Sequence, residues 1–256
     1  MKKIIAVLLA TVLLLTMMGC DGATKELTPM EVYTKINEAS DAVSSMESNM
    51  DMKMSIVADS MSMDISMTGT IRQVIRSETD IDMEMLMKMS IPDMGMEMEQ
   101  KGYYTDGWMY QDVMGSKIKT RVPVDEVMSQ MGADINASVA EEAIKNIEMT
   151  RSDSGDYNLT VELDAEKMTG MVDDLMASMG DMLNGEDADI TFGAMKYVMV
   201  ADKDFNMKTT DMQFAMDMEV AGEKAAVDYV ISIETVSVNS IEKIDFPSDL
   251  DTYVEM

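Results

Sequence analysis

The side chains of this sequence that could do chemistry are thioethers and a single thiol. The chain of 256 residues contains 35 methionines and one cysteine, Cys20, and it contains no histidine. Without histidine there is no serine or cysteine nucleophile paired with an imidazole, and no imidazole metal site. One cysteine cannot form a disulfide within the chain or a CxxC motif. What remains is the reactivity of one thiol, the soft, apolar character of the methionines, and the carboxylates of 48 acidic residues, of which a pair could serve as acid and base.

Methionine or isoleucine occupies every second position in four segments, 50–56, 61–67, 81–91 and 94–98. Successive side chains of a β-strand point to opposite faces of a sheet, so each segment predicts a strand with one apolar and one polar face. Pro92 predicts a break between the last two segments. The methionines that we expect to line an apolar wall are Met52, Met54, Met63, Met83, Met85, Met87, Met96, Met216 and Met218.

Three interpretations of these methionine faces stay open from the sequence. Methionine fills irregular space in a protein core, which requires no ligand. Methionine-rich surfaces also repack around variable partners, which would suit the acyl chain of a lipid. Soft thioethers select Cu(I) or Ag(I), although here they occupy positions that a core needs. We expect the lipid-binding face, with no metal, no cofactor and no catalytic residue.

Charge and composition exclude several other classes of protein. The chain has 48 acidic and 20 basic residues, a formal net charge of −28, whereas nucleic-acid binding needs a clustered cationic face. Aromatic residues make up 5% of the chain, which is too few for the stacking platforms that bind sugars or single-stranded nucleic acid. We also expect that the protein is not an enzyme. Segment 202–206 begins like a calcium loop, but Met207 stands where the loop needs glycine, so we expect a hairpin turn.

The first twenty residues predict export and a lipid anchor. Lys2 and Lys3 precede an apolar stretch over 4–15, which is too short to span a bilayer stably. Segment 17–20, Met-Met-Gly-Cys, resembles the lipobox of bacterial lipoproteins, in which a diacylglyceryl group is attached to the cysteine. This resemblance implies a signal peptide over 1–19, a lipidated (palmitate-type) Cys20 and a tether over 20–27. We therefore expect a protein anchored at the extracytoplasmic face of the cell membrane.

The rest of the chain alternates between helical and strand patterns. A capping box beginning at Thr28, with Pro29 at the first helical position, predicts a helix over 29–46. Asp106-Gly107 is a hairpin signal. Further helices are predicted over 124–131 and 164–184, the latter ending at Asn184-Gly185. Further strands are predicted over 116–121, 144–151, 157–163, 190–201, 207–221 and 224–238.

These elements predict a single α+β domain over 28–256. A sheet with one apolar face must cover that face. We expect a long curved antiparallel sheet, a half-barrel of about ten strands, wrapped around two or three amphipathic helices. This arrangement resembles the half-barrel lipoprotein superfamily, which includes LolA, LolB and the mycobacterial lipoproteins LppX and LprG. The hairpin over 103–110, followed by Lys117-Ile118-Lys119, is similar to one common in uncharacterised Gram-positive lipoproteins.

The resemblance implies that the concave, helix-covered face holds acyl chains or a lipidated client. We expect the protein to bind a lipid, another hydrophobic ligand or a lipidated protein partner, for transport or sensing at the cell envelope. We expect it to be a monomer and to have no nucleic-acid partner. Trp108, beside the predicted turn, is a candidate for the rim of the site. A Cu(I)- or Ag(I)-binding lipoprotein and a structural or signalling envelope protein are the alternatives.

Overall fold

A computed structural model describes residues 26–58, 61–77, 79–130, 143–164, 167, 188–220 and 223–256. Twelve strands account for most of these residues, together with two helices and two short 3-10 turns. The helices are α2 (Pro29–Asp41) and α3 (Val124–Gln130), and the turns are η1 (Pro92–Met94) and η4 (Leu250–Thr252). The strands are β1 (Ser45–Ala58), β2 (Met61–Ser77), β3 (Asp80–Ile91), β4 (Met96–Thr105), β5 (Trp108–Val113), β6 (Ser116–Arg121), β7 (Ile144–Arg151), β8 (Tyr157–Leu163), β9 (Ala188–Ala201), β10 (Met207–Val220), β11 (Glu223–Val238) and β12 (Val254–Glu255).

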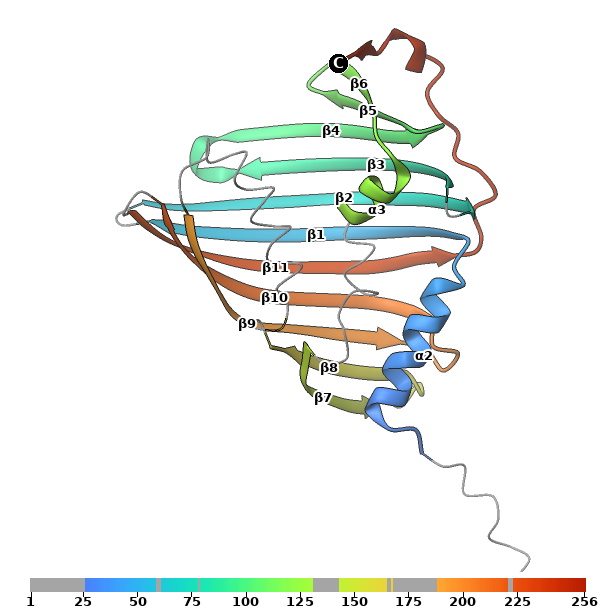
Figure 1. The fold of residues 1–256 in the computed structure, drawn as a ribbon, viewed down its shortest axis with the longest axis vertical. Coiled ribbons are helices and arrows are strands. Elements are labelled where there is room, and N and C mark those ends of the chain that lie inside the picture. The colour runs from blue at the N-terminus through green and yellow to red at the C-terminus, as the bar shows by residue number, and fades with distance from the viewer. Residues whose placement is uncertain are drawn as a thin grey trace, which may run out of the picture.

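All twelve strands form one open sheet, in the order β12-β6-β5-β4-β3-β2-β1-β11-β10-β9-β8-β7 (Figure 1). Strands β1 to β6 follow one another across one half, and β7 to β11 follow one another across the other half. The two halves are joined by the antiparallel pairing of β1 with β11, two strands far apart in the sequence. Strand β12 is the exception to the antiparallel pattern, because it pairs with β6 in parallel.

The predicted fold class is wrong in its helical part. The described residues form a twelve-stranded open sheet with one helix of thirteen residues, α2, and one of seven, α3. The described part of the chain is therefore mainly β, and within it the sheet has twelve strands rather than ten and is not wrapped around two or three amphipathic helices. The helix predicted over 164–184 lies outside the described residues except for Asp164 and Lys167.

The first helix begins where the sequence predicts and ends earlier. The Thr28 hydroxyl accepts a hydrogen bond from the Glu31 amide at 3.2 Å, and the Glu31 carboxylate accepts one from the Thr28 amide at 2.8 Å, which completes the capping box. The helix stops at Asp41 because the chain enters the sheet at once. The Ser44 carbonyl accepts a hydrogen bond from Ile75 in β2, and Ser45 pairs with β2 as the first residue of β1.

Most of the predicted strands and turns are confirmed. Asp106 and Gly107 adopt positive φ angles of 52° and 77°, as a tight hairpin turn requires. The predicted break after Ile91 is the turn η1, which ends at Gly95 with φ 60°. The bounds of β6, β7 and β8 equal the predicted ones, and β9, β10 and β11 differ from the predicted strands by one or two residues at an end.

Two separate hydrophobic cores hold the helices on the same face of the sheet. In the first, Val32 and Ile36 of α2 are fully buried against strands β8 and β9, together with Leu159 and Met199. In the second, Val127 of α3 packs with Met83 and Tyr104. The strands in the middle of the sheet, β11, β1 and β2, contribute no fully buried residue to either core cluster, although Ile71 of β2 packs against the second, so their apolar face lies between the two cores.

Candidate functional site

One continuous apolar surface crosses the sheet, and we call it the methionine face. The strand registers place nine apolar side chains in a single row from β7 to β4, each one opposite the next on the neighbouring strand. The row consists of Ile147, Val161, Tyr197, Met212, Ile231, Met52, Met67, Met89 and Met98. The last four are methionines on four consecutive strands, an arrangement that local alternation alone does not specify.

The rows on either side of this one are also apolar in the middle of the sheet. On one side Ile233, Met50, Gly69 and Met87 lie opposite one another, and on the other side Tyr229, Met54 and Ile65 do so. Within residues 50–58, 61–75, 81–91 and 225–233, the side chains of this face include no charged group. The central methionines are half-buried, in contrast to the fully buried residues of the two cores: Met50, Met52, Met54, Met67, Met85, Met87 and Met89.

The structure divides the predicted wall residues into three groups. All nine methionines belong to the methionine face by register, and six of them are half-buried: Met52, Met54, Met63, Met85, Met87 and Met218. Met83 is fully buried beneath α3, and Met216 is 2% exposed, so these two are core residues. Met96, at the start of β4, is 42% exposed.

Trp108 lies on the opposite face of the sheet from the predicted wall. Its neighbour Met109 pairs with Tyr104 on the methionine face, so Trp108 must point the other way. There the Lys119 ammonium lies 5.1 Å and the Arg121 guanidinium 5.7 Å from the centre of its ring. Trp108 is thus held by two cations on the far side of the β5–β6 hairpin and is not at the rim of the methionine face.

Sequence reasoning left several residues of the central rows out of the candidate wall. Met50, Met67, Met89 and Met98 lie in or beside the nine-residue row, and Ile231 joins the methionines of β1 to those of β10. The alternation of the sequence places each of them on an apolar face. Only the register of one strand against another shows that they adjoin the chosen residues.

Two glycines on this face make room for methionine side chains. A Cβ added at Gly69 would collide with the Met87 sulfur and would lie 2.6 Å from the Leu86 carbonyl oxygen. A Cβ at Gly102 would lie 2.8 Å from the terminal methyl of Met85. In both cases the methionine stands directly opposite the glycine on the neighbouring strand and lies across it. The long thioether side chains therefore lie along the sheet at these positions.

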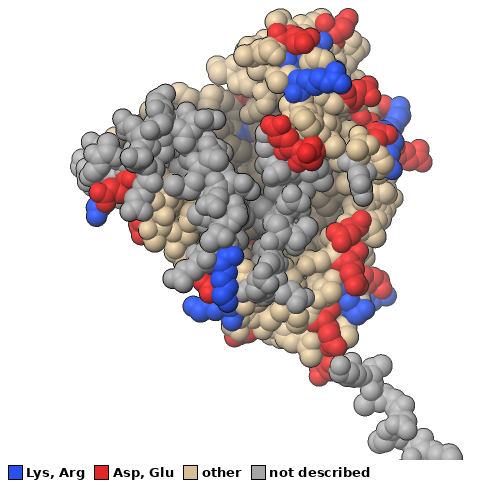
Figure 2. All heavy atoms as spheres, viewed as in Figure 1, with Lys and Arg blue, Asp and Glu red and all other residues tan. Residues whose placement is uncertain are grey.

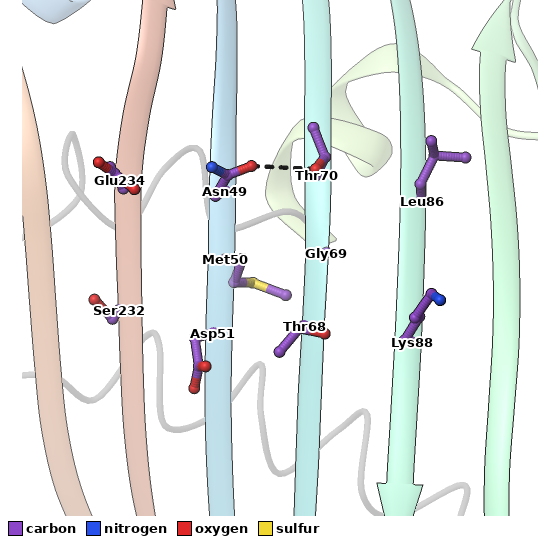
Figure 3. Close-up of a pocket in the computed structure, with 10 residues that line it drawn as sticks. All are labelled: Asn49, Met50, Asp51, Thr68, Gly69, Thr70, Leu86, Lys88, Ser232 and Glu234. Atoms are coloured by element: carbon purple, nitrogen blue, oxygen red, sulfur yellow. Dashed lines mark hydrogen bonds between the residues drawn. The ribbon is translucent and has the colours of Figure 1, made fainter.

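The other face of the sheet, the polar face, carries the charged residues of the central strands. It contains a groove of about 520 Å³ over β11, β1, β2 and β3 (Figure 3). Eight of its lining residues point to the polar face: Asn49, Asp51, Thr68, Thr70, Leu86, Lys88, Ser232 and Glu234. This groove is on the opposite side of the sheet from the predicted methionine wall. On the side that carries α2 and α3, the visible charged side chains lie mainly over α3 and around the margin (Figure 2).

The C-terminal segment closes the polar face at the β4–β6 end. Phe246 makes an edge contact with Tyr103 at 6.2 Å between ring centres, and Tyr253 makes one with Tyr110 at 5.5 Å. The Lys117 ammonium forms an ion pair with Asp249, and this hydrogen bond lowers the pKa of the Asp249 carboxyl. The segment ends in β12, so that this edge of the sheet is covered by the chain's own terminus (Figure 1).

Buried hydroxyls and the 202–206 turn are satisfied within the protein. The Tyr197 hydroxyl donates a hydrogen bond to the Tyr33 hydroxyl of α2 at 3.1 Å, and burial together with this bond raises the pKa of Tyr197. The Asp202 carboxylate accepts hydrogen bonds from the amides of Asp204 and Asn206, as expected for a turn between β9 and β10. In the described part of the chain, no three His, Cys, Asp or Glu side chains gather as metal ligands, and no helix is long and apolar enough to cross a membrane.

The architecture defines a class of protein: an open, mainly antiparallel sheet with a methionine-rich apolar face that carries one helix over each half. The chain belongs to a family of unknown function, DUF6612, which it matches over residues 28–252. No curated protein matches the chain.

Several solved structures are similar in outline. LprF from Mycobacterium bovis is 11% identical with a TM-score of 0.43, covering 86% of this chain and 96% of its own. A putative outer membrane lipoprotein-sorting protein domain from Vibrio parahaemolyticus is 10% identical with a TM-score of 0.27, covering 86% and 95%. The ywiB protein from Bacillus subtilis is 11% identical with a TM-score of 0.24, covering 78% and 99%. At such scores the likeness carries no argument about a ligand, which must come from the residues themselves.

Proposed function

We propose that this protein is a lipid-anchored, extracytoplasmic lipoprotein that binds a hydrophobic ligand, the acyl chain of a lipid or of a lipidated partner, on its methionine face. The observation that carries the proposal is the unbroken apolar row across β7 to β4, whose central methionines are half-buried between the two packed cores. A purely structural face would be expected to be as fully buried as Met83 or Leu159.

Physical chemistry favours an acyl chain as the occupant. Each methylene moved from water to an apolar surface contributes about 0.8 kcal/mol, so a chain of about ten methylenes would supply roughly 8 kcal/mol before the costs of ordering it. The unbranched methionines adapt to a flexible chain better than valine or isoleucine would, although those residues favour strands more. The absence of charge from the described central face removes the desolvation cost that a buried charge would impose.

The anchor is proposed at Cys20, which lies outside the described residues. Two or three acyl chains on one residue hold a protein firmly in a bilayer. With a formal charge of −28, the chain is repelled by anionic headgroups, so we propose that it stands away from the membrane on the short tether over 20–27. We propose binding without catalysis, for transport or sensing at the envelope.

Native mass spectrometry of gently extracted protein, together with titration by a fluorescent fatty-acid probe, tests the ligand. We expect co-purifying lipid and saturable displacement of the probe by unlabelled fatty acid. Protein that carries no lipid and does not bind the probe would contradict the ligand proposal and would favour a structural or signalling role. The anchor is tested separately, because an alkyne palmitate analogue should label the wild-type chain and not the Cys20→Ala variant.

A further inference from the structure

We propose that the methionines around Gly69 form a binding site for a soft monovalent cation, Cu(I) or Ag(I), in the centre of the methionine face. The site is built from Met50, Met52, Met67, Met87 and Met89, which lie on three adjacent strands. It goes beyond lipid binding, because it depends on sulfur rather than on apolar area.

The geometry begins at Gly69, where the sheet has no side chain. Met50 of β1 and Met87 of β3 both stand directly opposite this glycine on its two sides. The Met87 sulfur occupies the position that a side chain at Gly69 would take. From the other side the Met50 side chain extends from β1 toward β2, in the direction of Gly69 (Figure 3). Two methionines from non-adjacent strands, Met50 and Met87, therefore flank the intervening glycine.

The neighbouring row adds further thioethers at short range. Met52, Met67 and Met89 lie opposite one another on the same three strands, two residues along from Met50, Gly69 and Met87. Directly opposed residues have Cβ atoms about 4.5–5.5 Å apart, and diagonal neighbours about 7–8 Å. A methionine side chain has three rotatable bonds between its Cα and its terminal methyl. Three sulfurs can thus converge on one ion by changing rotamers without moving the backbone.

The chemistry of this patch selects a soft cation. Thioethers bind Cu(I), whereas Mg²⁺ and Ca²⁺ require oxygen ligands. The carboxylates of the central strands, such as Asp51 and Glu84, point to the polar face and are not available as ligands on this side. They nevertheless contribute to the strongly negative field of the chain, which raises the local concentration of cations. All five methionines are half-buried, so an ion can reach them while much of the water is excluded.

The test compares leucine variants at and away from the patch, in the full chain with Cys20→Ala so that the thiol cannot bind the metal. Met50→Leu/Met87→Leu removes the sulfurs of the two methionines that flank Gly69 and keeps the apolar area. The matched control, Met61→Leu/Met94→Leu, removes two sulfurs that are 70% and 65% exposed. Binding is measured by isothermal titration with Ag(I) and by anaerobic competition for Cu(I) against a chelator of known affinity.

We expect one equivalent of Ag(I) or Cu(I) to bind the parent and the control equally, and the Met50/Met87 variant to bind at least tenfold more weakly. In a ¹³C-methyl methionine spectrum of the parent, the ion should shift a few of the methionine signals. The proposal is overturned if the parent does not bind, if the patch variant binds as the parent does, or if the control loses as much affinity. Lipid binding is scored separately, by titrating the parent with the fatty-acid probe in the absence of metal, so failure of the metal site is distinguishable from failure of lipid binding.

Discussion

The substitution Met67→Glu tests most directly whether the methionine face is the binding surface. Met67 is a half-buried member of the nine-residue row, between Met52 of β1 and Met89 of β3. The next residue along β2, Thr68, points to the polar face and is exposed. The pair Met67→Glu and Thr68→Glu therefore places the same carboxylate one residue apart on opposite sides of the same strand.

The expected loss of affinity follows from the contact that Met67 can make. An acyl chain lying along the row would place roughly two or three of its methylenes against this side chain, worth about 2 kcal/mol. Each 1.4 kcal/mol changes a dissociation constant tenfold, so Met67→Glu should weaken binding of a fatty-acid probe by about 30-fold. The carboxylate would also have to lose water when the chain binds, which acts in the same direction. Thr68→Glu should change the dissociation constant by less than about threefold.

Fluorescence titration with the same fatty-acid probe measures both variants, and far-UV circular dichroism checks that both keep the sheet. Because Met67 is only half-buried, the new carboxylate can stay hydrated in the unliganded protein, so we expect both variants to fold. Equal weakening by the two substitutions would show that the effect is one of overall charge. An unchanged dissociation constant for Met67→Glu would show that the fatty-acid probe binds elsewhere on the protein.

Three further predictions concern stability and the C-terminal segment. Tyr197→Phe should lower the free energy of unfolding, measured by urea unfolding, by about 1 kcal/mol, because it leaves the Tyr33 hydroxyl without its hydrogen-bond donor. The double change Tyr33→Phe/Tyr197→Phe should lower it by less than the sum of the two single changes. The pKa of Tyr197 is raised on folding, so its contribution to the free energy of unfolding is complete below about pH 10, the value for an unfolded tyrosine. This contribution is lost as the pH rises from there toward the folded pKa. Tyr197→Phe should therefore flatten the alkaline decline in stability. Gly69→Ala should destabilise the protein by about 1–3 kcal/mol and Gly102→Ala by less, as measured by thermal unfolding. The new Cβ at residue 69 would meet a backbone carbonyl oxygen, whereas the new Cβ at residue 102 would meet only the methyl group of a flexible side chain. Asp249→Asn should speed hydrogen exchange in residues 239–256 without changing that of the central strands, because it breaks the ion pair of the terminal segment.

Each of these predictions has a result that would contradict it. A double tyrosine variant that loses the full sum of the single changes would mean that the two hydroxyls act independently. Equal melting temperatures for Gly69→Ala and Gly102→Ala would mean that the backbone at Gly69 can shift away from a Cβ. Unchanged exchange in Asp249→Asn would mean that aromatic contacts alone hold the terminal segment.

The sequence by itself determined the strands and the face to which each side chain points. Alternation with a period of two is a local property, so Met83, Met85, Met87 and Met89 had to share one face of β3. Turn chemistry is local as well, and the Asp106-Gly107 turn could be predicted from two residues. The capping box at Thr28 identified the start of α2 for the same reason.

Only the tertiary structure decided which of these faces adjoin and which methionines are buried. The pairing of β1 with β11 joins segments far apart in the chain, and no local pattern specifies that Met52 faces Ile231 on one side and Met67 on the other. The same holds for the burial of Met83, which depends on α3 lying over it, and for the end of α2, where pairing with β2 overrides a helical pattern. Strand register and helix docking result from contacts between distant segments, and a periodic pattern along one segment carries no information about them.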